Sequence, residues 1–263
     1  MKRTLWILCL LISQPELLLA ESPEEKGLAI AVESDRRDTG FNDSKAEMLM
    51  TLRNRHGEQS IRHMRVKVLE VQDDGDKSIF VFDRPRDVKG TGLLSYSHKV
   101  GNDDQWLYLP ALKRVKRISS ANKSGSFMGS EFAYEDFASQ EVEKYTYKYL
   151  RNESCPGDAK MDCFVSERYP VDENSGYTRQ VGWIDSKEYR PQKIEFYDRK
   201  NTLLKTLVFK GYQQYLGQYW RADELIMDNH QTGKSTTLSW SGYKFRNNLS
   251  AKDFTRNSLK RVK

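Results

Sequence analysis

Residues 63–83, HMRVKVLEVQDDGDKSIFVFD, decide the fold class of this chain. Met64, Val66 and Val68 alternate with polar or charged side chains, which is the period-two pattern of a strand with one buried face. The turn-forming sequence Asp-Asp-Gly at 73–75 separates this strand from the apolar run SIFVFD. The stretch therefore predicts an antiparallel hairpin.

The same strand pattern continues on both sides of this hairpin. Upstream, KAEMLMTLR (45–53) places Ala46, Met48, Met50 and Leu52 on one face. Downstream, the strand candidates are QWLYL, RVKRIS, EKYTYKYL, CFVSERYP, TRQVGWID, QKIEFYD, LLKTLVF, YWRADELIM and STTLSWSGYKF. Because the connections are short and rich in Gly, Asn, Asp and Pro, we expect an antiparallel meander of about a dozen strands rather than parallel βαβ units.

Helices are scarce in this sequence. One is predicted to begin at Pro23, because Ser22 is a favoured N-cap and proline is favoured at the first helical position. We expect Leu28, Ala31 and Val32 to form its apolar stripe. Short helices are also expected within EFAYEDFAS and near the C-terminus within AKDFTRNSLKR.

A long, polar sheet with so few helices must bury its apolar face by curling around a core or cavity that the helices close. Small or partly open barrels of this kind tend to hold apolar ligands. Neither an internal repeat nor a linker-like segment divides the chain. We therefore expect one mainly β (α+β) domain over residues 21–263.

The N-terminus has the layout of a secretory signal peptide. Lys2 and Arg3 precede the apolar run Leu5–Ile12, and Ala20 ends the small-residue region where cleavage is expected. The apolar run is far shorter than the about 20 residues that a transmembrane helix needs. We expect residues 1–20 to be removed and the mature protein to be exported and soluble.

Charge and motifs limit the classes of partner and activity. A formal net charge of +6, well mixed along the chain, does not indicate a nucleic-acid binder. The four histidines, His56, His63, His98 and His230, lack metal-ligand spacing, and no nucleophile-elbow, zinc-protease or P-loop motif is present. We expect no enzyme activity, no metal and no cofactor.

Two cysteines follow the predicted signal peptide. Cys155 and Cys163 flank the turn-forming sequence PGD in CPGDAKMDC. In an oxidising compartment this spacing predicts a disulfide that closes a hairpin loop, worth roughly 2–3 kcal/mol. A metal site would need more ligands, and a redox pair is usually spaced C-x-x-C.

Residues 103–118 predict a second hairpin, which turns at Pro-Ala-Leu (110–112). Its second strand carries four cations, Lys113, Arg114, Lys116 and Arg117. Cations on both faces suit an edge strand, where they hinder aggregation between sheets. Contact with anionic membrane headgroups is the functional alternative.

Three consecutive motifs resemble a known family: PRDVKGTGLLSY (85–96), DDQWLYLPALKRVKRIS (103–119) and SGSFMGSEFAYEDF (124–137). They are similar to the exported outer-membrane lipoprotein-sorting proteins, which share the LolA-like fold. The resemblance implies a curved antiparallel half-barrel with a few lid helices over a hydrophobic cavity. The resemblance also implies that the protein carries an acyl chain or a lipidated protein through the periplasm. This implied function rests on the shared fold.

Three functions therefore stay open. The first is a periplasmic carrier of lipid or lipoprotein acyl chains, and the second is a periplasmic adaptor of an inner-membrane lipid-exporting transporter. The third, a hydrolase, is the least supported. A carrier should co-purify with lipid, whereas an adaptor should be empty and co-purify with a membrane protein.

The expected ligand contacts come from two places. Trp106 and Tyr108 are predicted to face the cavity with Leu93, because large aromatics bury the most apolar area. A shift of one residue would instead turn the apolar Leu107 and Leu109 inward. The glycine-punctuated loop after this hairpin is predicted to cover the cavity mouth through Phe127, Met128 and Phe132, with packing in the core as the alternative.

Overall fold

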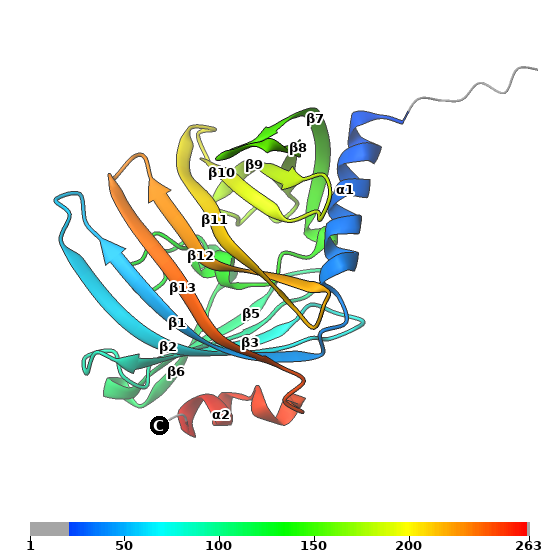
Figure 1. Cartoon of the computed structure of the whole chain (residues 1–263). Coiled ribbons are helices and arrows are strands. Elements are labelled where there is room, and N and C mark those ends of the chain that lie inside the picture. Colours follow the sequence, from blue (N-terminus) through cyan, green and yellow to red (C-terminus); the bar gives the residue numbers. More distant parts are fainter. Residues whose placement is uncertain (1–20, 262–263) are drawn as a thin grey trace, which may run out of the picture.

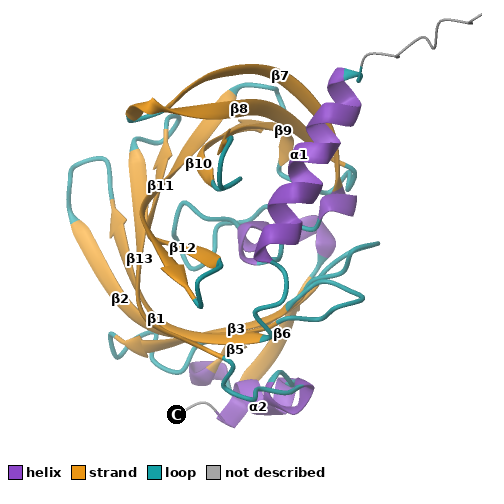
Figure 2. Cartoon of the chain, turned by 45° about the vertical axis from the view of Figure 1, so that its right-hand side comes forward, coloured by secondary structure: helices purple, strands orange, loops and turns teal. Residues whose placement is uncertain are grey.

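The structure, a computed structural model that describes residues 21–261, consists of one curved antiparallel sheet with two α-helices (Figure 1). The sheet is open rather than closed into a barrel, and it is strongly curved (Figure 2). Its thirteen strands are β1 (Asp43–Arg53), β2 (Gln59–Leu69), β3 (Lys77–Arg84), β4 (Gly92–Tyr96), β5 (Asp104–Leu109), β6 (Arg114–Ile118), β7 (Tyr145–Cys155), β8 (Asp158–Pro170), β9 (Tyr177–Asp185), β10 (Pro191–Asp198), β11 (Leu203–Tyr215), β12 (Tyr219–Asn229) and β13 (Lys234–Phe245). The predicted fold class is confirmed.

The strand order differs from a simple meander. It is β6-β5-β4-β3-β2-β1-β13-β12-β11-β10-β9-β8-β7, so β1 pairs with β13 at the centre and two meanders extend from there. The consecutive strands β6 and β7 therefore lie at opposite edges of the sheet. Residues 119–144, here called the crossing segment, connect those edges. Their aromatic side chains pack in the same core cluster as the inward-facing residues of the sheet.

One strand, β4, was not predicted. Its central residues Leu93 and Leu94 are both fully buried, but they belong to different clusters on opposite faces of the sheet. A strand covered on both sides has no alternation of polar and apolar residues. The period-two pattern that marks the other strands is therefore absent from β4.

The helix α1 (Pro23–Asp38) begins as predicted. Ser22 accepts a hydrogen bond from the Glu25 backbone N–H, and the Glu25 carboxylate accepts one from Ser22, which forms a capping box. The predicted apolar stripe is wrong for Leu28 and Val32, which are 46% and 47% exposed, whereas Ala31 is partly buried.

The buried residues of α1 are instead Gly27 and Ile30. A Cβ atom on Gly27 would lie 2.8 Å from the backbone nitrogen of Tyr149, so the helix backbone packs directly on β7. This contact covers one edge of the sheet.

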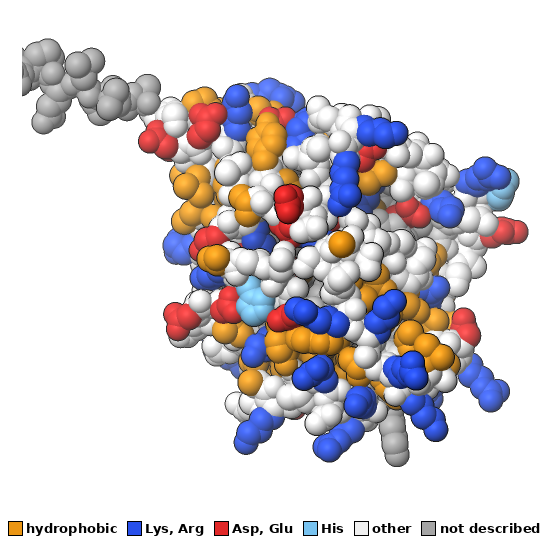
Figure 3. Space-filling model, turned by 180° about the vertical axis from the view of Figure 1, so that it is seen from behind, with side chains coloured by type: hydrophobic (Ala, Val, Ile, Leu, Met, Phe, Trp, Pro, Cys, Tyr) orange, Lys and Arg blue, Asp and Glu red, His pale blue; other side chains and the backbone are white. Residues whose placement is uncertain are grey.

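The remaining helices are short. α2 (Arg256–Arg261) packs on β4 and β5, and 3-10 helices occupy Pro110–Leu112, Ser120–Asn122, Tyr134–Phe137, Val142–Lys144 and Ala251–Asp253. Leu259 of α2 and the adjacent Phe254 fill a cluster on the convex face, with Ile79, Val81 and Leu94 of the sheet. Many Lys and Arg side chains project from this end of the molecule (Figure 3).

The predicted signal peptide, residues 1–20, lies outside the described residues. In residues 21–261, no helix combines the length and the apolar character needed to cross a membrane.

Candidate ligand cavity

A cavity of about 590 Å³ lies between α1 and the concave face of the sheet. This volume falls within the roughly 300–1,000 Å³ typical of small-molecule sites. Residues from α1, from the end of the crossing segment and from most of the central and β7-side strands line it. The apolar part of the lining includes Ile30, Ala31, Phe41, Ala46, Val66, Val68, Val142, Ile184, Pro191, Ile194, Phe209, Trp220, Ala222, Leu225 and Trp240.

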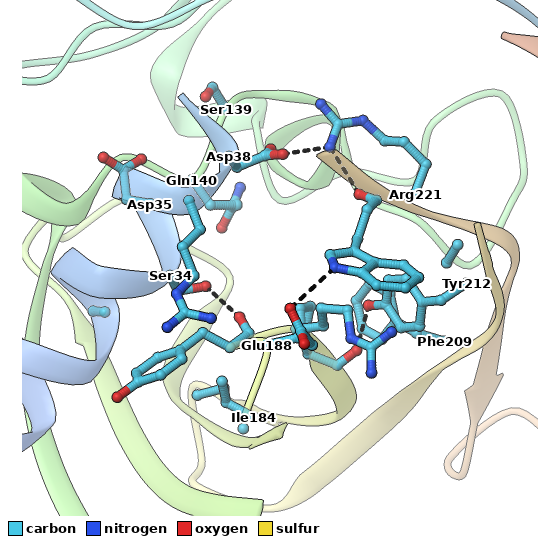
Figure 4. A pocket seen from close by; sticks show the side chains of 18 of the residues that line it. Ser34, Asp35, Asp38, Ser139, Gln140, Ile184, Glu188, Phe209, Tyr212 and Arg221 are labelled. Atoms are coloured by element: carbon cyan, nitrogen blue, oxygen red, sulfur yellow. Dashed lines mark hydrogen bonds and ion pairs between the residues drawn. The ribbon is translucent and has the colours of Figure 1, made fainter. Parts of the chain in front are cut away.

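The helix α1 forms one wall of the cavity and is fastened by polar contacts. The Ser34 hydroxyl donates to the backbone carbonyl of Tyr189 at 2.8 Å, and Arg37 donates to the carbonyl of Lys187 at 2.7 Å. Both acceptors lie in the β9–β10 turn. Only Gly27 and Ile30 of α1 are buried. The polar side chains of Ser34 and Asp35 line the cavity (Figure 4).

An ion pair joins the end of α1 to β12. Arg221 donates a hydrogen bond to the Asp38 carboxylate across one side of the cavity (Figure 4). Partial desolvation inside the cavity raises the pKa of Asp38, whose side chain is 54% exposed, and the Arg221 charge opposes that shift. Partial desolvation likewise raises the pKa of Asp35, with the Lys99 charge opposing it.

A second arginine, Arg190, also lines the cavity. Arg190 donates to Asp185 at 2.7 Å, and its guanidinium lies 4.9 Å from the ring centroid of Tyr212 and 4.4 Å from that of Trp220. The Trp220 indole donates to Glu188 at 3.3 Å. These contacts hold the rings of Tyr212 and Trp220 in the cavity wall. They also place the charged groups of Arg190 and Glu188 in the lining.

A smaller chamber of about 230 Å³ adjoins the cavity. The two spaces share five lining residues, Val68, Asp76, Ser139, Leu225 and Trp240. Burial raises the pKa of Asp76 to about 7. The indole nitrogen of Trp240 is buried and has no hydrogen-bond partner among the described residues.

The predicted face of β5 is wrong. Leu93 does pack on the concave side, together with Leu107. Trp106 and Tyr108 pack on the convex cluster under α2, and Arg256 lies 5.8 Å from the Trp106 ring. The one-residue alternative, with Leu107 and Leu109 inward, describes the structure.

The aromatic residues of the crossing segment pack in the core. Phe127 and Phe132 are 0% and 3% exposed, and both contact Phe137. Met128 is half-buried against the same cluster. Phe132 lines the smaller chamber, but none of the six predicted ligand contacts lines the main cavity. The expectation of exposed residues at the cavity mouth is therefore wrong for Phe127 and Phe132.

The predicted edge strand and the predicted disulfide are both present. β6 is an edge strand, as predicted. Its cations Arg114, Lys116 and Arg117 are exposed, as is Lys113 immediately before it. Cys155 and Cys163 form the predicted disulfide across the β7–β8 hairpin. Among residues 21–261, no group of three or more His, Cys, Asp or Glu side chains is arranged to hold a metal.

The sequence placed Ala46, Val66 and Val68 on strand faces but did not single out the polar residues that line the main cavity. Arg190 and Arg221 were not singled out, because isolated arginines in strands or turns usually lie on the surface. The available signal was a pair of opposite charges, Asp38 at the end of the predicted helix and Arg221 in a predicted strand. It becomes visible only when the helix is placed over the sheet.

The comparisons with known proteins agree with this architecture. A family model described only as an uncharacterized protein matches residues 74–261. A solved outer membrane lipoprotein-sorting protein domain from Vibrio parahaemolyticus is 58% identical, with a TM-score of 0.88 over 90% of this chain and 100% of that chain. The chain belongs to the outer-membrane lipoprotein-sorting family.

Two further solved structures extend the comparison. A DUF1329 family protein from Desulfovibrio piger is 32% identical, with a TM-score of 0.84 over 90% of this chain and 99% of that chain. A LolA superfamily protein from Nitrosomonas europaea shares the fold at 24% identity, with a TM-score of 0.70 over 88% and 98% of the two chains. No curated protein matches the chain.

Proposed function

We propose that this member of the lipoprotein-sorting family is a periplasmic carrier that binds an acyl chain of a lipid or lipidated protein. The observation that carries the proposal is the cavity of about 590 Å³ under α1, with its apolar floor and polar rim. Apolar walls favour a hydrocarbon chain because binding removes both surfaces from water. The polar rim suits the hydrated end of such a ligand.

The test compares two substitutions of the same kind. Ala31→Trp places an indole from α1 into the cavity, whereas Ala159→Trp adds one at the exposed tip of the β7–β8 hairpin. Filling the cavity should weaken binding of a fluorescent fatty-acid probe about tenfold or more, since overpacking costs about 1–3 kcal/mol. The hairpin variant should bind as the wild type does. Equal probe binding by both variants would contradict the proposed site.

A second measurement separates the carrier from the adaptor alternative. Protein isolated from the periplasm should carry extractable lipid, detected by native mass spectrometry. An empty protein that co-purifies with an inner-membrane transporter would instead support the adaptor. The same sample should begin near Glu21, which tests the predicted cleavage and export.

The absence of enzyme activity stays a prediction. A hydrolase would convert a bound lipid into products, and replacement of one Asp, Glu or His would abolish that turnover. Incubation of lipid-loaded protein, followed by mass analysis of the lipid, checks this alternative directly.

A further inference from the structure

Seven cations gather at the end of the molecule remote from α1. Four belong to the β5–β6 hairpin, Lys113, Arg114, Lys116 and Arg117. Three belong to α2, Arg256, Lys260 and Arg261. All seven are exposed, and many Lys and Arg side chains surround apolar surface at this end (Figure 3).

Contacts on the convex face bring these two segments together. β6 pairs with β5, so Arg117 lies opposite Trp106 and Val115 opposite Tyr108. α2 packs on β4 and β5, and Arg256 lies over the Trp106 ring. Cations about 140 residues apart in sequence therefore share one surface, here called the basic end.

The basic end carries charge that the fold does not neutralise. Arg117 pairs with Asp104, but none of the other six cations forms an ion pair with a described residue. Protection of an edge strand explains cations on β6. Edge protection does not explain the three further cations on α2, because a helix has no exposed strand edge.

Apolar groups accompany the charge. Leu112 stands at the hairpin tip and is 63% exposed. Trp106, Tyr108 and Val115 lie partly buried behind it. Leucine, aromatic rings and unpaired cations together are typical of surfaces that settle at the bilayer interface, where cations meet anionic headgroups.

We propose that the basic end docks on the surface of an anionic lipid bilayer. Charge complementarity attracts the seven cations to the headgroups, and Leu112 enters the interface. The cations lie on both faces of an edge strand and on a separate helix, so a fluid surface can engage all of them without a fixed partner geometry. None of these residues lines the main cavity, so docking is independent of ligand binding.

Vesicle co-sedimentation tests the proposal with the mature protein. The wild type should sediment with vesicles of phosphatidylcholine and phosphatidylglycerol at low salt and remain in solution with phosphatidylcholine alone. High salt should release it, because counterions screen exposed charges. Failure to sediment with the anionic vesicles would overturn the proposal, and binding to immobilised polyglutamate alone would identify an acidic protein as the partner instead.

Three variants locate the contact. Replacing Lys113, Arg114, Lys116 and Arg117 with Gln should reduce vesicle affinity by about fivefold per cation at low salt, and the equivalent α2 variant should do the same. Leu112→Ser should weaken binding without changing its salt dependence. The fatty-acid probe should bind all three as it binds the wild type, which separates this test from that of the cavity.

The matched control removes four exposed cations elsewhere, Lys160, Lys187, Lys210 and Lys234. It has the same net charge as the β5–β6 variant and should keep wild-type vesicle affinity. If this control loses affinity as strongly as the β5–β6 variant, overall charge rather than the basic end attracts the vesicles. That result would overturn the proposal, and thermal melts confirm that each variant is folded.

Discussion

The ammonium group of Lys205 lies 2.7 Å from the carboxylate of Asp136, so strand β11 is joined directly to the crossing segment. Both side chains are at most 10% exposed. Lys205 also donates to the backbone carbonyl of Glu131 at 2.9 Å, and the Tyr177 hydroxyl donates to Asp136 at 2.9 Å. This network holds the crossing segment against the concave face.

Lys205→Met should destabilise the protein by about 3–5 kcal/mol, because it leaves the Asp136 carboxylate buried without its cation. Adding Asp136→Asn should recover part of that loss, since no uncompensated charge remains. Urea unfolding of the single and double variants measures both effects. The control Lys200→Met, at an exposed position, should change stability by less than about 0.5 kcal/mol. An equally small effect of Lys205→Met would show that the pair does not hold the segment.

Phe127 should contribute to the stability of the folded protein. Its ring is fully buried and contacts Phe82, Tyr134 and Phe137. Phe127→Ala should therefore cost about 3–5 kcal/mol in the free energy of unfolding, through lost burial and a new cavity. Chemical denaturation measures this change. A melting temperature close to that of the wild type would restore the interpretation of Phe127 as an exposed lid residue.

The strands were predictable where one face of the sheet is covered and the other is solvated. Met48 and Met50 in β1, and Met64 and Val66 in β2, are buried as their alternation predicts. β5 is covered on both faces, by the crossing segment and by α2. Its apolar residues therefore do not alternate with polar ones, and the local pattern could not decide which of them turn inward.

The cavity was less predictable because α1 covers a hollow rather than a packed core. A helix on a packed core shows an apolar stripe toward it. Here Ser34 and Asp35 border the cavity, whereas Leu28 is exposed. The pairing of β1 with β13 was equally hidden, since it joins the two ends of the chain and leaves no local signal.

The disulfide should stabilise the β7–β8 hairpin. Mass analysis of the unreduced exported protein should show Cys155 joined to Cys163, and replacement of both by Ser should cost about 2–3 kcal/mol through loop-closure entropy. Two alkylatable thiols in the native mature protein would contradict the pairing. Cys163 is fully buried, so a single Cys163→Ser variant should lose more than the entropy alone.

Asp76 should make stability fall as the pH rises toward neutrality. Burial, together with the charges of Glu141, Glu70 and Asp38, raises its pKa to about 7, although the Val71 backbone N–H donates to it. In the unfolded chain an aspartate titrates near about pH 4, so between these values the folded state binds more protons than the unfolded state. Stability contributed by the protonated carboxyl is therefore lost from about pH 4 to about pH 7.

Asp76→Asn keeps this position neutral at every pH. It should raise the free energy of unfolding above pH 7 by an amount on the order of 2–4 kcal/mol, with little effect at about pH 4. Urea unfolding across this pH range measures the difference between the variant and the wild type. Asp73→Asn, on the same turn but exposed, is the control and should follow the wild type. If the curves for Asp76→Asn and the wild type stay parallel, Asp76 ionises alike in both states, and burial beside the cavity does not govern its titration.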